Sequence, residues 1–457
     1  MNRKSRRILI LSSIVLGTVM VFALGWSWST RNPEGLTLRA LGEAAGHSYV
    51  YGYPLVLMDE TRRAAGLAPN TLHHARSLPG AGFTAVVRPN TDTLYSTAWL
   101  DLGAGPQVLD IPPMEGRYWL FQGLDAWTNV FADSGSRTLG DTGARIVIAG
   151  PDWQGEAPDG VTLYRAPTAM AWLLGRIEID GAGDLDAVHA LQDRISLRAL
   201  EPGAAGISVS PEPPGAFPPP ETVRGLDAEA FFERLARLMA ANPPDAEDDA
   251  VLDQLSAIGV AAGQTVDWAD FGPLALEAIT RGVGTARERL DAGPPRPPGW
   301  TLPADHIGRY GTDYTYRAGV ALYGLGANLP EDSLYPSTLT DEGGALLMGG
   351  RAYRLRFEAD GVPPVNAFWS ITLYDAAGYL IANPAGRYAV SSRDDLVREG
   401  DGSLVLDIHS GPPAPGREAN WLPAPQEGEF NLLARLYWPR EEGLSGDWQM
   451  PPVEPLD

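Results

Sequence analysis

The stretch PPMEGRYWLFQGLDAW at 112–127 decides the fold, together with its partial repeat PPVNAFWSITLYDAAG at 363–378. Each stretch starts with two prolines, continues into an aromatic and apolar run, and reaches Asp-Ala six residues after a tryptophan. Such runs, bounded by proline and turn residues, are typical of β-strands. We therefore expect equivalent strands in two related sheets, although a proline-bounded aromatic strand is also a common core strand in its own right.

Further short strands are expected around both stretches. They are rich in Val, Tyr, Trp, Leu and Ile, and they alternate with turn residues. The pattern predicts a protein that is mainly β with an α insert: two tandem β-sandwich or jelly-roll-like domains joined by a helical segment. The expected strands are Thr93–Leu102, Arg117–Gly123, Arg145–Ile148, Val161–Arg165, Trp172–Ile179, Arg351–Glu358, Phe368–Asp375, Leu404–Ile408 and Phe430–Tyr437.

Helices are expected in three places. Apolar residues recur at helical spacing from 36 to 66, as one helix or as two short ones broken near Gly52 and Pro54. A second helix is expected at 184–200, where an apolar stripe recurs. After a Pro- and Gly-rich stretch, a helical insert is expected from the patterns at 227–241, 248–262 and 274–292.

These elements divide the chain into four parts. We expect a signal anchor or signal peptide at 1–30, and an N-terminal helix with a β-sandwich domain at 36–200. A Pro/Gly linker with the helical insert follows at 201–298, and a second β-sandwich domain occupies 299–457.

The first residues have the pattern of an export signal. Four basic residues among the first seven precede a mostly apolar run at 8–28. The run is long enough to span a membrane as a helix, whereas Ala23-Leu24-Gly25 fits a cleavage site, and a buried helix of the fold is the third possibility. We expect an exported, periplasmic or extracytoplasmic protein, anchored in the inner membrane by residues 8–28.

The composition excludes several classes of function. With a net charge of −22 the chain is a poor partner for nucleic acid. It has no cysteine, and its single lysine is Lys4, so disulfides, cysteine-bound zinc, Schiff bases and phosphate-loop lysines are excluded from the body of the protein. Nucleophile-elbow, zinc-helix, EF-hand and dinucleotide motifs are missing, and the six histidines are scattered. We therefore predict neither a cofactor nor a metal.

The strongest polar cluster is Arg88, Asn90, Asp92 and Tyr95, at a turn that we expect to follow a strand at Ala85–Arg88. Arg88 offers a planar fork for an anionic or carbonyl oxygen, and Asn90 offers an amide for ligand binding. Asp92 and Tyr95 are candidate base and acid, with Tyr95 preferred because an Asp beside Arg has a lowered pKa. Alternatively, Asn90 and Asp92 only form the turn, and Arg88 pairs with Asp92 to hold it.

Two weaker clusters complete the candidate site. The candidate ligand-binding residues of the first are Arg117, Asp125, Asn129 and Arg137, and those of the C-terminal half are Trp369, Tyr374 and Arg387. Arginines and rings that flank a groove bind sugars or anions. The alternative is a sandwich core with a satisfied buried Asp.

Several of these motifs resemble a known pair of bacterial families. The stretches YGYP at 51–54, VVRPNTDTLYSTAWLDL at 86–102 and PPMEGRYWLFQGLDAWTNVF at 112–131 resemble domain of unknown function 1254. The stretches FWSITLYDAAGYLIANPAGRYAV at 368–390 and NWLPAPQEGEFNLLARLYWP at 420–439 resemble domain of unknown function 1214. The resemblance implies tandem jelly-roll-like domains and frequent export, and no agreed activity or catalytic residues.

Three functions remain open at this point. The first is an extracytoplasmic hydrolase or lyase that acts on a small-molecule or glycan-like ligand through Tyr95, Asp92 and Arg88. The second is a non-catalytic ligand- or carbohydrate-binding module, and the third is a structural or assembly protein. The expected partners are the ligand and, through the N-terminal segment, a membrane; the oligomeric state is left open.

Overall fold

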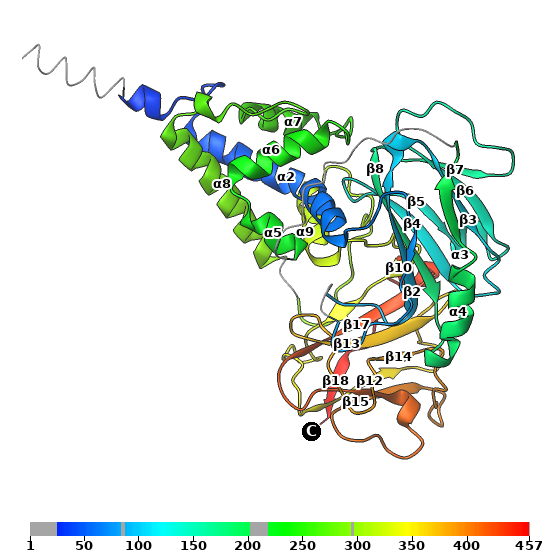
Figure 1. The fold of residues 1–457 in the computed structure, drawn as a ribbon. Helices are drawn as coiled ribbons and strands as arrows, with labels where there is room; N and C mark the ends of the chain where they lie inside the picture. The colour runs from blue at the N-terminus through cyan, green and yellow to red at the C-terminus, as the bar shows by residue number, and fades with distance from the viewer. Residues whose placement is uncertain (1–24, 84–86, 202–217, 294–296, 457) are drawn as a thin grey trace, which may run out of the picture. The chain divides into compact units, whose positions relative to one another are not determined.

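The computed structural model describes residues 25–83, 87–201, 218–293 and 297–456 (Figure 1). They form two compact units. The first comprises the described residues within Met1–Glu60, Gly215–Gly293 and Gly311–Ala318; the second comprises those within Thr61–Pro214, Pro294–Tyr310 and Gly319–Asp457. The fold is mainly β, with two tandem β-sandwiches and a helical segment, as the sequence predicts.

The first unit consists of helices. Helix α2 (Leu38–Ala65) is continuous and contains Pro54 within it. At Gly52 a Cβ atom would lie 2.4 Å from Cδ2 of Leu235, so the absence of a side chain lets α6 (Ala228–Met239) approach α2. The other helices of this unit are α5 (Pro219–Gly225), α6 (Ala228–Met239), α7 (Asp249–Ala257), α8 (Pro273–Ala292) and the first residues of α9 (Tyr314–Gly324).

A buried ion-pair cluster joins α2 to α6. Arg234 of α6 lies 2.6 Å from Oδ2 of Asp59 through Nη2 and 2.8 Å from Oε2 of Glu60 through Nη1. All three side chains are buried. One guanidinium is thus neutralised by two carboxylates in the interior of the helical unit.

The N-terminal sandwich of the second unit has two sheets around one apolar core. The β1-β2-β8-β4-β5 sheet consists of His73–His74, Thr93–Asp101, Met170–Glu178, Trp119–Asp125 and Val130–Gly135, in that order. The β7-β6-β3-β9 sheet consists of Thr162–Arg165, Ala144–Ala149, Gln107–Ile111 and Ser196–Ala199.

The C-terminal sandwich is built in the same way around a separate core. The β10-β17-β13-β14 sheet consists of Ser333–Leu334, Phe430–Tyr437, Trp369–Asp375 and Ala389–Ser391, with β11 (Ser337–Thr338) also paired to β17. The β16-β15-β12-β18 sheet consists of Trp421–Pro423, Leu404–His409, Ala352–Phe357 and Val453–Leu456.

Strands β4 and β13 hold equivalent positions in the two sandwiches, as their sequences predict. Each begins at a buried tryptophan whose backbone N–H donates to a serine: Trp119 to Ser136 (2.9 Å) and Trp369 to Ser392 (3.1 Å). Each ends at an aspartate, Asp125 or Asp375, whose Oδ1 accepts from the backbone N–H groups two and four residues later.

The register of the neighbouring strands extends this equivalence. Arg176 of β8 lies opposite Leu120 of β4, and Arg435 of β17 lies opposite Ser370 of β13. Leu120 and Ser370 each follow the tryptophan that begins their strand. The two arginines therefore occupy corresponding places in two related sheets.

Two expected elements differ in the structure. Residues 184–200 do not form one helix: α4 (Leu185–Gln192) ends early, and β9 then pairs with β3, because the open edge of that sheet offers backbone partners that outweigh a further turn of helix. Residues 84–86 of the strand expected at Ala85–Arg88 lie outside the described residues. At Arg88 the backbone has a positive φ of 52°, which no strand residue adopts.

The compact units also divide the chain differently from the expected domain boundaries. Residues of α2 up to Glu60 belong with the helices of the insert, and both sandwiches fall in one unit. The apolar face of α2 is covered by other helices, such as Phe231 of α6 against Tyr49 at 4.5 Å between ring centroids. The boundaries at 36–200, 201–298 and 299–457 stay a prediction.

The expected membrane segment falls mostly outside the described residues, which begin at residue 25. In the part of the chain that the structure covers, none of the helices combines the length and the hydropathy needed to cross a membrane.

Candidate functional site

The turn that precedes β2 is bound by the C-terminal sandwich. The carbonyl oxygen of Arg88 accepts a hydrogen bond from Nη2 of Arg435 (3.1 Å), and that of Pro89 accepts one from the hydroxyl of Tyr374 (2.8 Å). The positive φ of Arg88 turns the chain so that these two carbonyl groups can be reached. The turn thus joins the two sandwiches within one unit.

Asp92 is the acceptor at the centre of this contact. Its Oδ2 accepts from the hydroxyl of Ser370 (2.5 Å) and from that of Tyr437 (3.0 Å), and its Oδ1 lies 3.8 Å from Nη2 of Arg393. The Asp92 side chain is only 2% exposed. Arg393 of the C-terminal half is therefore a cation beside Asp92, and the expected pairing of Arg88 with Asp92 stays a prediction.

Asn90 connects the turn to the same group. Its Nδ2 donates to the hydroxyl of Tyr437 (2.9 Å), and its Oδ1 accepts from the backbone N–H of Asp92 (2.7 Å). The side chain therefore forms the turn, as the second alternative expects, and also reaches across to the C-terminal sandwich. Its role in ligand binding stays a prediction.

Tyr95 lies beside a buried arginine. It stands opposite Arg176 in the β2–β8 ladder, so both side chains leave the same face of the sheet. Nε of Arg176 lies 3.3 Å from the Tyr95 hydroxyl, and the guanidinium lies 5.1 Å from the ring centroid. Its Nη1 donates to Gln122 (3.0 Å) and its Nη2 to the carbonyl of Gly326 (2.8 Å).

This contact changes the acidity of Tyr95. Burial raises the pKa of its hydroxyl, but the positive charge of Arg176, with smaller effects from Arg435 and Asn90, lowers that pKa below its ordinary value. Tyr374 and Tyr437 behave in the opposite way, because burial raises the pKa of each and the arginine nearby offsets only part of the rise. Of these three tyrosines, Tyr95 is thus the one whose hydroxyl loses its proton most readily.

Arg435 is the counterpart of Arg176 in the C-terminal half. Its Nη1 donates to Thr372 (2.8 Å) and its Nη2 to the hydroxyl of Tyr374 (2.6 Å). We call the whole group the polar centre: Asn90, Asp92, Tyr95, Arg176, Tyr374, Arg393, Arg435 and Tyr437. Of the predicted residues, the structure brings Asn90, Asp92, Tyr95 and Tyr374 into it, together with the backbone of Arg88.

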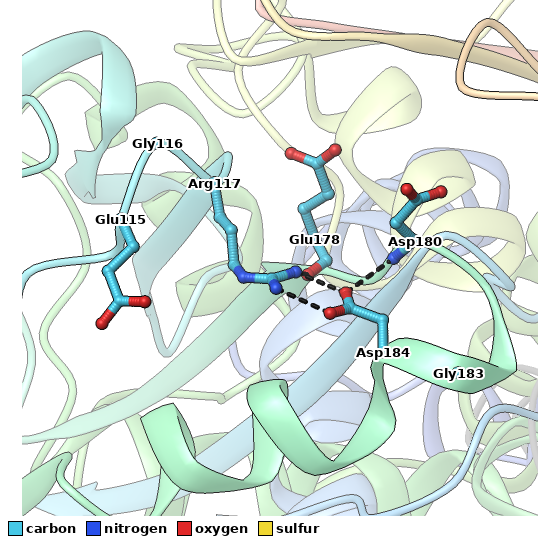
Figure 2. A pocket seen from close by; sticks show the side chains of 7 residues that line it. All are labelled: Glu115, Gly116, Arg117, Glu178, Asp180, Gly183 and Asp184. Atoms are coloured by element: carbon cyan, nitrogen blue, oxygen red, sulfur yellow. Dashed lines mark hydrogen bonds and ion pairs between the residues drawn. The ribbon is translucent and has the colours of Figure 1, made fainter.

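Arg117 lies outside the polar centre, in a charged pocket of about 480 Å³. Figure 2 shows its guanidinium reaching the carboxylate of Asp184, at 2.6 Å between Nη2 and Oδ1, while the carboxylates of Glu178 and Asp180 point away from that pair. The lining residues are Glu115, Gly116, Arg117, Glu178, Asp180, Gly183 and Asp184.

One pocket residue also contacts the polar centre. Oε1 of Glu178 lies 3.3 Å from Nη1 of Arg393, which is the arginine that pairs with Asp92. The two carboxylates share this one cation.

The other predicted residues have structural partners. Asp125 forms the turn after β4 and accepts from the side chain of Asn129 at 3.1 Å. Arg137 pairs with Asp133 and Asp332, each at 2.7 Å. These three residues thus hold a turn and a loop, and Asp125 fits the alternative of a satisfied buried aspartate.

Trp369 and Arg387 lie apart from the polar centre as well. The ring of Trp369 belongs to the core of the C-terminal sandwich and lies 5.7 Å from that of Phe357. Arg387 donates to the carbonyl groups of Glu418 (2.8 Å) and Ala419 (2.6 Å) and pairs with Asp394 at 2.6 Å. Among the described residues, no group of three or more His, Asp or Glu side chains could hold a metal ion.

The prediction missed the three arginines of the polar centre. Arg176 and Arg435 each stand inside an apolar strand, in MAWLLGRIE at 170–178 and FNLLARLY at 430–437. A charged residue on the buried face of such a strand is a signal that was present in the sequence, because burial of an unpaired charge is costly. Arg393 lies in a loop and carries no comparable signal.

Comparison with known proteins agrees with this architecture. Residues 69–199 match the family described as protein of unknown function DUF1254, and residues 332–441 match protein of unknown function DUF1214. The chain combines a DUF1254 region with a DUF1214 region. The first match spans the N-terminal sandwich and the second spans much of the C-terminal one, so both regions contribute to the polar centre. No curated protein matches the chain.

Two solved structures are similar to the chain. The VPA0106 protein from Vibrio parahaemolyticus is 25% identical, with a TM-score of 0.70, and the match covers 92% of this chain and 100% of that protein. An uncharacterized protein from Burkholderia cenocepacia is 12% identical, with a TM-score of 0.47, over 92% of this chain and 93% of that one.

Proposed function

We propose that the polar centre is the active site of an extracytoplasmic hydrolase or lyase for a small-molecule or glycan-like ligand, in which Tyr95 transfers the proton. The observation that carries the proposal is the contact between the Tyr95 hydroxyl and Nε of Arg176, at 3.3 Å. A tyrosine whose pKa is lowered below its ordinary value gives up and regains its proton more readily, which suits it to general acid–base catalysis.

In a hydrolysis, the Tyr95 hydroxyl donates its proton to the leaving oxygen as water attacks and the scissile bond breaks. The tyrosinate that remains is stabilised by the guanidinium of Arg176, and it regains a proton from the attacking water. Asp92 acts here as a positioning residue and not as the base, because its carboxylate already accepts from Ser370 and Tyr437.

The proposal is tested with Tyr95→Phe, which keeps the ring and removes the hydroxyl. Full-length protein is assayed on p-nitrophenyl esters, p-nitrophenyl glycosides and polygalacturonate, whose cleavage by elimination yields an unsaturated, absorbing product. We expect turnover by the wild type and a loss of about 10²–10⁴-fold in kcat for Tyr95→Phe. The exposed Tyr323 supplies the control, since Tyr323→Phe should leave kcat unchanged. Equal turnover by Tyr95→Phe and the wild type would reject Tyr95 as the proton-transfer group.

A non-catalytic binding module is the second candidate. The observation in its favour is that both carboxylate oxygens of Asp92 already have partners in the protein. Asp92 therefore does not assist Tyr95 as a second acid–base group. Binding without turnover on all three classes of substrate would favour this candidate.

The proposal includes export, which rests on the sequence pattern of residues 1–30. A reporter fused to the C-terminus is expected to be active outside the cytoplasm. A reporter active only in the cytoplasm contradicts it.

A further inference from the structure

Two guanidinium groups of the polar centre are buried without a carboxylate partner. Arg176 is 4% exposed and Arg435 is 2% exposed. In the described part of the chain, neither lies within 4 Å of an Asp or Glu oxygen, and their hydrogen-bond acceptors are hydroxyl, amide and carbonyl oxygens. Such buried cations are normally neutralised by an anion, since burial of an uncompensated charge is costly.

The carboxylates nearby do not remove this excess of positive charge. Asp92 pairs with Arg393, which also pairs with Glu178. Three arginines of the polar centre, Arg176, Arg393 and Arg435, thus face two carboxylates. At least one positive charge of the group stays without an anionic partner among the described residues.

Arg176 and Arg435 act on the same two tyrosines, although the charge of Asp92 also acts on Arg435. The charges of Arg176 and Arg435 lower the pKa of Tyr95, and they also offset part of the rise that burial causes in the pKa of Tyr335. Tyr95 and Tyr335 each keep a water-accessible part of their surface, although burial is the largest influence on both hydroxyl groups.

A third observation, independent of charge, comes from the segment that covers Arg176. The carbonyl of Gly326 accepts from Arg176 and from Gln122. Two residues later stands Asn328, whose side chain is 1% exposed. Neither Nδ2 nor Oδ1 of Asn328 has a hydrogen-bond partner among the described residues. A buried amide without protein partners is suited to a polar ligand.

From these observations we infer that the polar centre takes a ligand bearing an oxyanion, a carboxylate or a phosphate, which binds between Arg176 and Arg435. The guanidinium fork matches the two oxygens of either group. The inference rests on the proposed function, because it names the substrate class of the same site. For a carboxylate next to an abstractable proton, it also places positive charge where negative charge develops when Tyr95 removes that proton.

The experiment compares probes that differ in the anionic group. Full-length protein is titrated by calorimetry with D-glucuronate, with D-glucose as the neutral counterpart, and with inorganic phosphate. We expect D-glucuronate or phosphate to bind and D-glucose not to bind. Arg176→Met and Arg435→Met should each weaken binding at least tenfold, whereas Arg145→Met on β6, a surface arginine paired with Asp110, should leave it unchanged.

A second readout does not depend on the arginine variants. The ionisation of Tyr95 is followed by tyrosinate absorbance, as the difference between wild type and Tyr95→Phe. A bound anion neutralises the arginines, so it should move the ionisation of Tyr95 to higher pH in the wild type. Absence of this shift at tens of millimolar D-glucuronate and phosphate would overturn the inference, and so would unchanged binding to Arg176→Met.

The outcomes separate the inference from the proposed function. If neutral glycosides or esters are turned over in a reaction that needs Tyr95, and no anion binds, the proposed enzymatic function is supported and the inference of an oxyanion ligand is overturned. Anion binding to Tyr95→Phe at wild-type affinity supports the oxyanion whether or not turnover is found. If Tyr95 is already ionised at neutral pH and no anion binds, the tyrosinate is itself the missing anion and the inference fails.

Discussion

Arg234 in the helical unit and Arg176 in the β unit are both buried arginines, but they are neutralised differently. Arg234 is 8% exposed and contacts the carboxylates of Asp59 and Glu60. Arg176 is 4% exposed and contacts a hydroxyl, an amide and a carbonyl oxygen. The first arrangement contains its own counter-ions, whereas the second presents a net positive charge in the interior.

The difference distinguishes a structural cluster from a candidate site. Removal of Arg234 takes away the cation that two buried carboxylates contact, so we expect this arginine to contribute to stability. Removal of Arg176 leaves only neutral acceptors behind, and a neutral donor could satisfy these as well, so stability alone gives little reason for a charge at that place. A buried charge that the fold itself does not need is best explained by a ligand or a reaction that uses it.

The largest effect is expected for Arg234→Met. This change removes the buried guanidinium that both Asp59 and Glu60 contact, and we expect the free energy of unfolding to fall by about 3–5 kcal/mol. Urea unfolding followed by circular dichroism measures it. Arg237→Met, at an exposed position of the same helix, should change stability by less than about 0.5 kcal/mol. A loss below about 1 kcal/mol for Arg234→Met would remove the contrast between the two arginines.

Asp92→Asn tests the carboxylate of the polar centre. The change weakens the hydrogen bonds from Ser370 and Tyr437 and leaves Arg393 with one carboxylate instead of two. We expect a loss of about 1–3 kcal/mol in the same unfolding experiment. Asp110→Asn, which breaks exposed ion pairs with Arg145 and Arg198, should cost less than about 1 kcal/mol. Equal losses of unfolding free energy for the two variants would show that the buried Asp92 contributes no more to stability than a carboxylate on the surface.

His74 shows what a partly buried group does when it can give up its charge. Burial, with a smaller effect of Arg76, lowers the pKa of His74 to about 4. The neutral His74 therefore contributes its full stability at pH values above about 6.5, the pKa of histidine in the unfolded chain. This contribution is lost as the pH falls towards 4. A buried arginine cannot become neutral in this way, because its guanidinium stays protonated.

We expect the stability of the wild type to fall by about 1–2 kcal/mol between pH 6.5 and 4 on account of His74. His74→Gln should remove this part of the pH dependence, while the exposed His306→Gln should keep it. The comparison uses unfolding free energies at four pH values. An unchanged pH dependence in His74→Gln would mean that the group keeps an ordinary pKa.

The smallest effect on stability is expected for Arg176→Met. The change removes three hydrogen bonds, but it also removes the cost of burying a charge without a carboxylate of the described residues within 4 Å; because the two effects oppose each other, we expect a net difference of about 1 kcal/mol or less. The same variant should raise the pKa of Tyr95, which spectrophotometric titration measures, because the nearest positive charge is gone. A loss as large as that of Arg234→Met would mean that Arg176 is also a structural residue.

Most of the β-strands were predictable because each carries its own signal. The runs at 93–102, 351–358 and 430–437 are apolar and bounded by turn residues, and each became a strand. The strand at the end of the region 184–200 could not be predicted from its own residues, because β9 forms only where β3 leaves an open edge. Edge pairing depends on a distant strand and leaves no periodic pattern of its own.

The candidate site was predictable only in part. Asn90, Asp92 and Tyr95 stood out because polar residues at a turn are concentrated in a short stretch. Arg117, Asp125, Asn129 and Arg137 stood out for the same reason, yet the structure gives them partners in loops and turns. Local composition therefore selects polar residues without separating those that hold a turn from those that meet across two sheets.

The sequence by itself determined the strand pattern, the helical insert and the equivalence of Trp119 with Trp369, because secondary structure follows from residue spacing within short segments. The tertiary structure decided which charges meet. Arg176 and Arg435 lie opposite Leu120 and Ser370 through strand register, and Asp92 reaches Ser370 across 278 positions of the chain. Electrostatic compensation is a property of groups brought together in space, so no local pattern in the sequence records it.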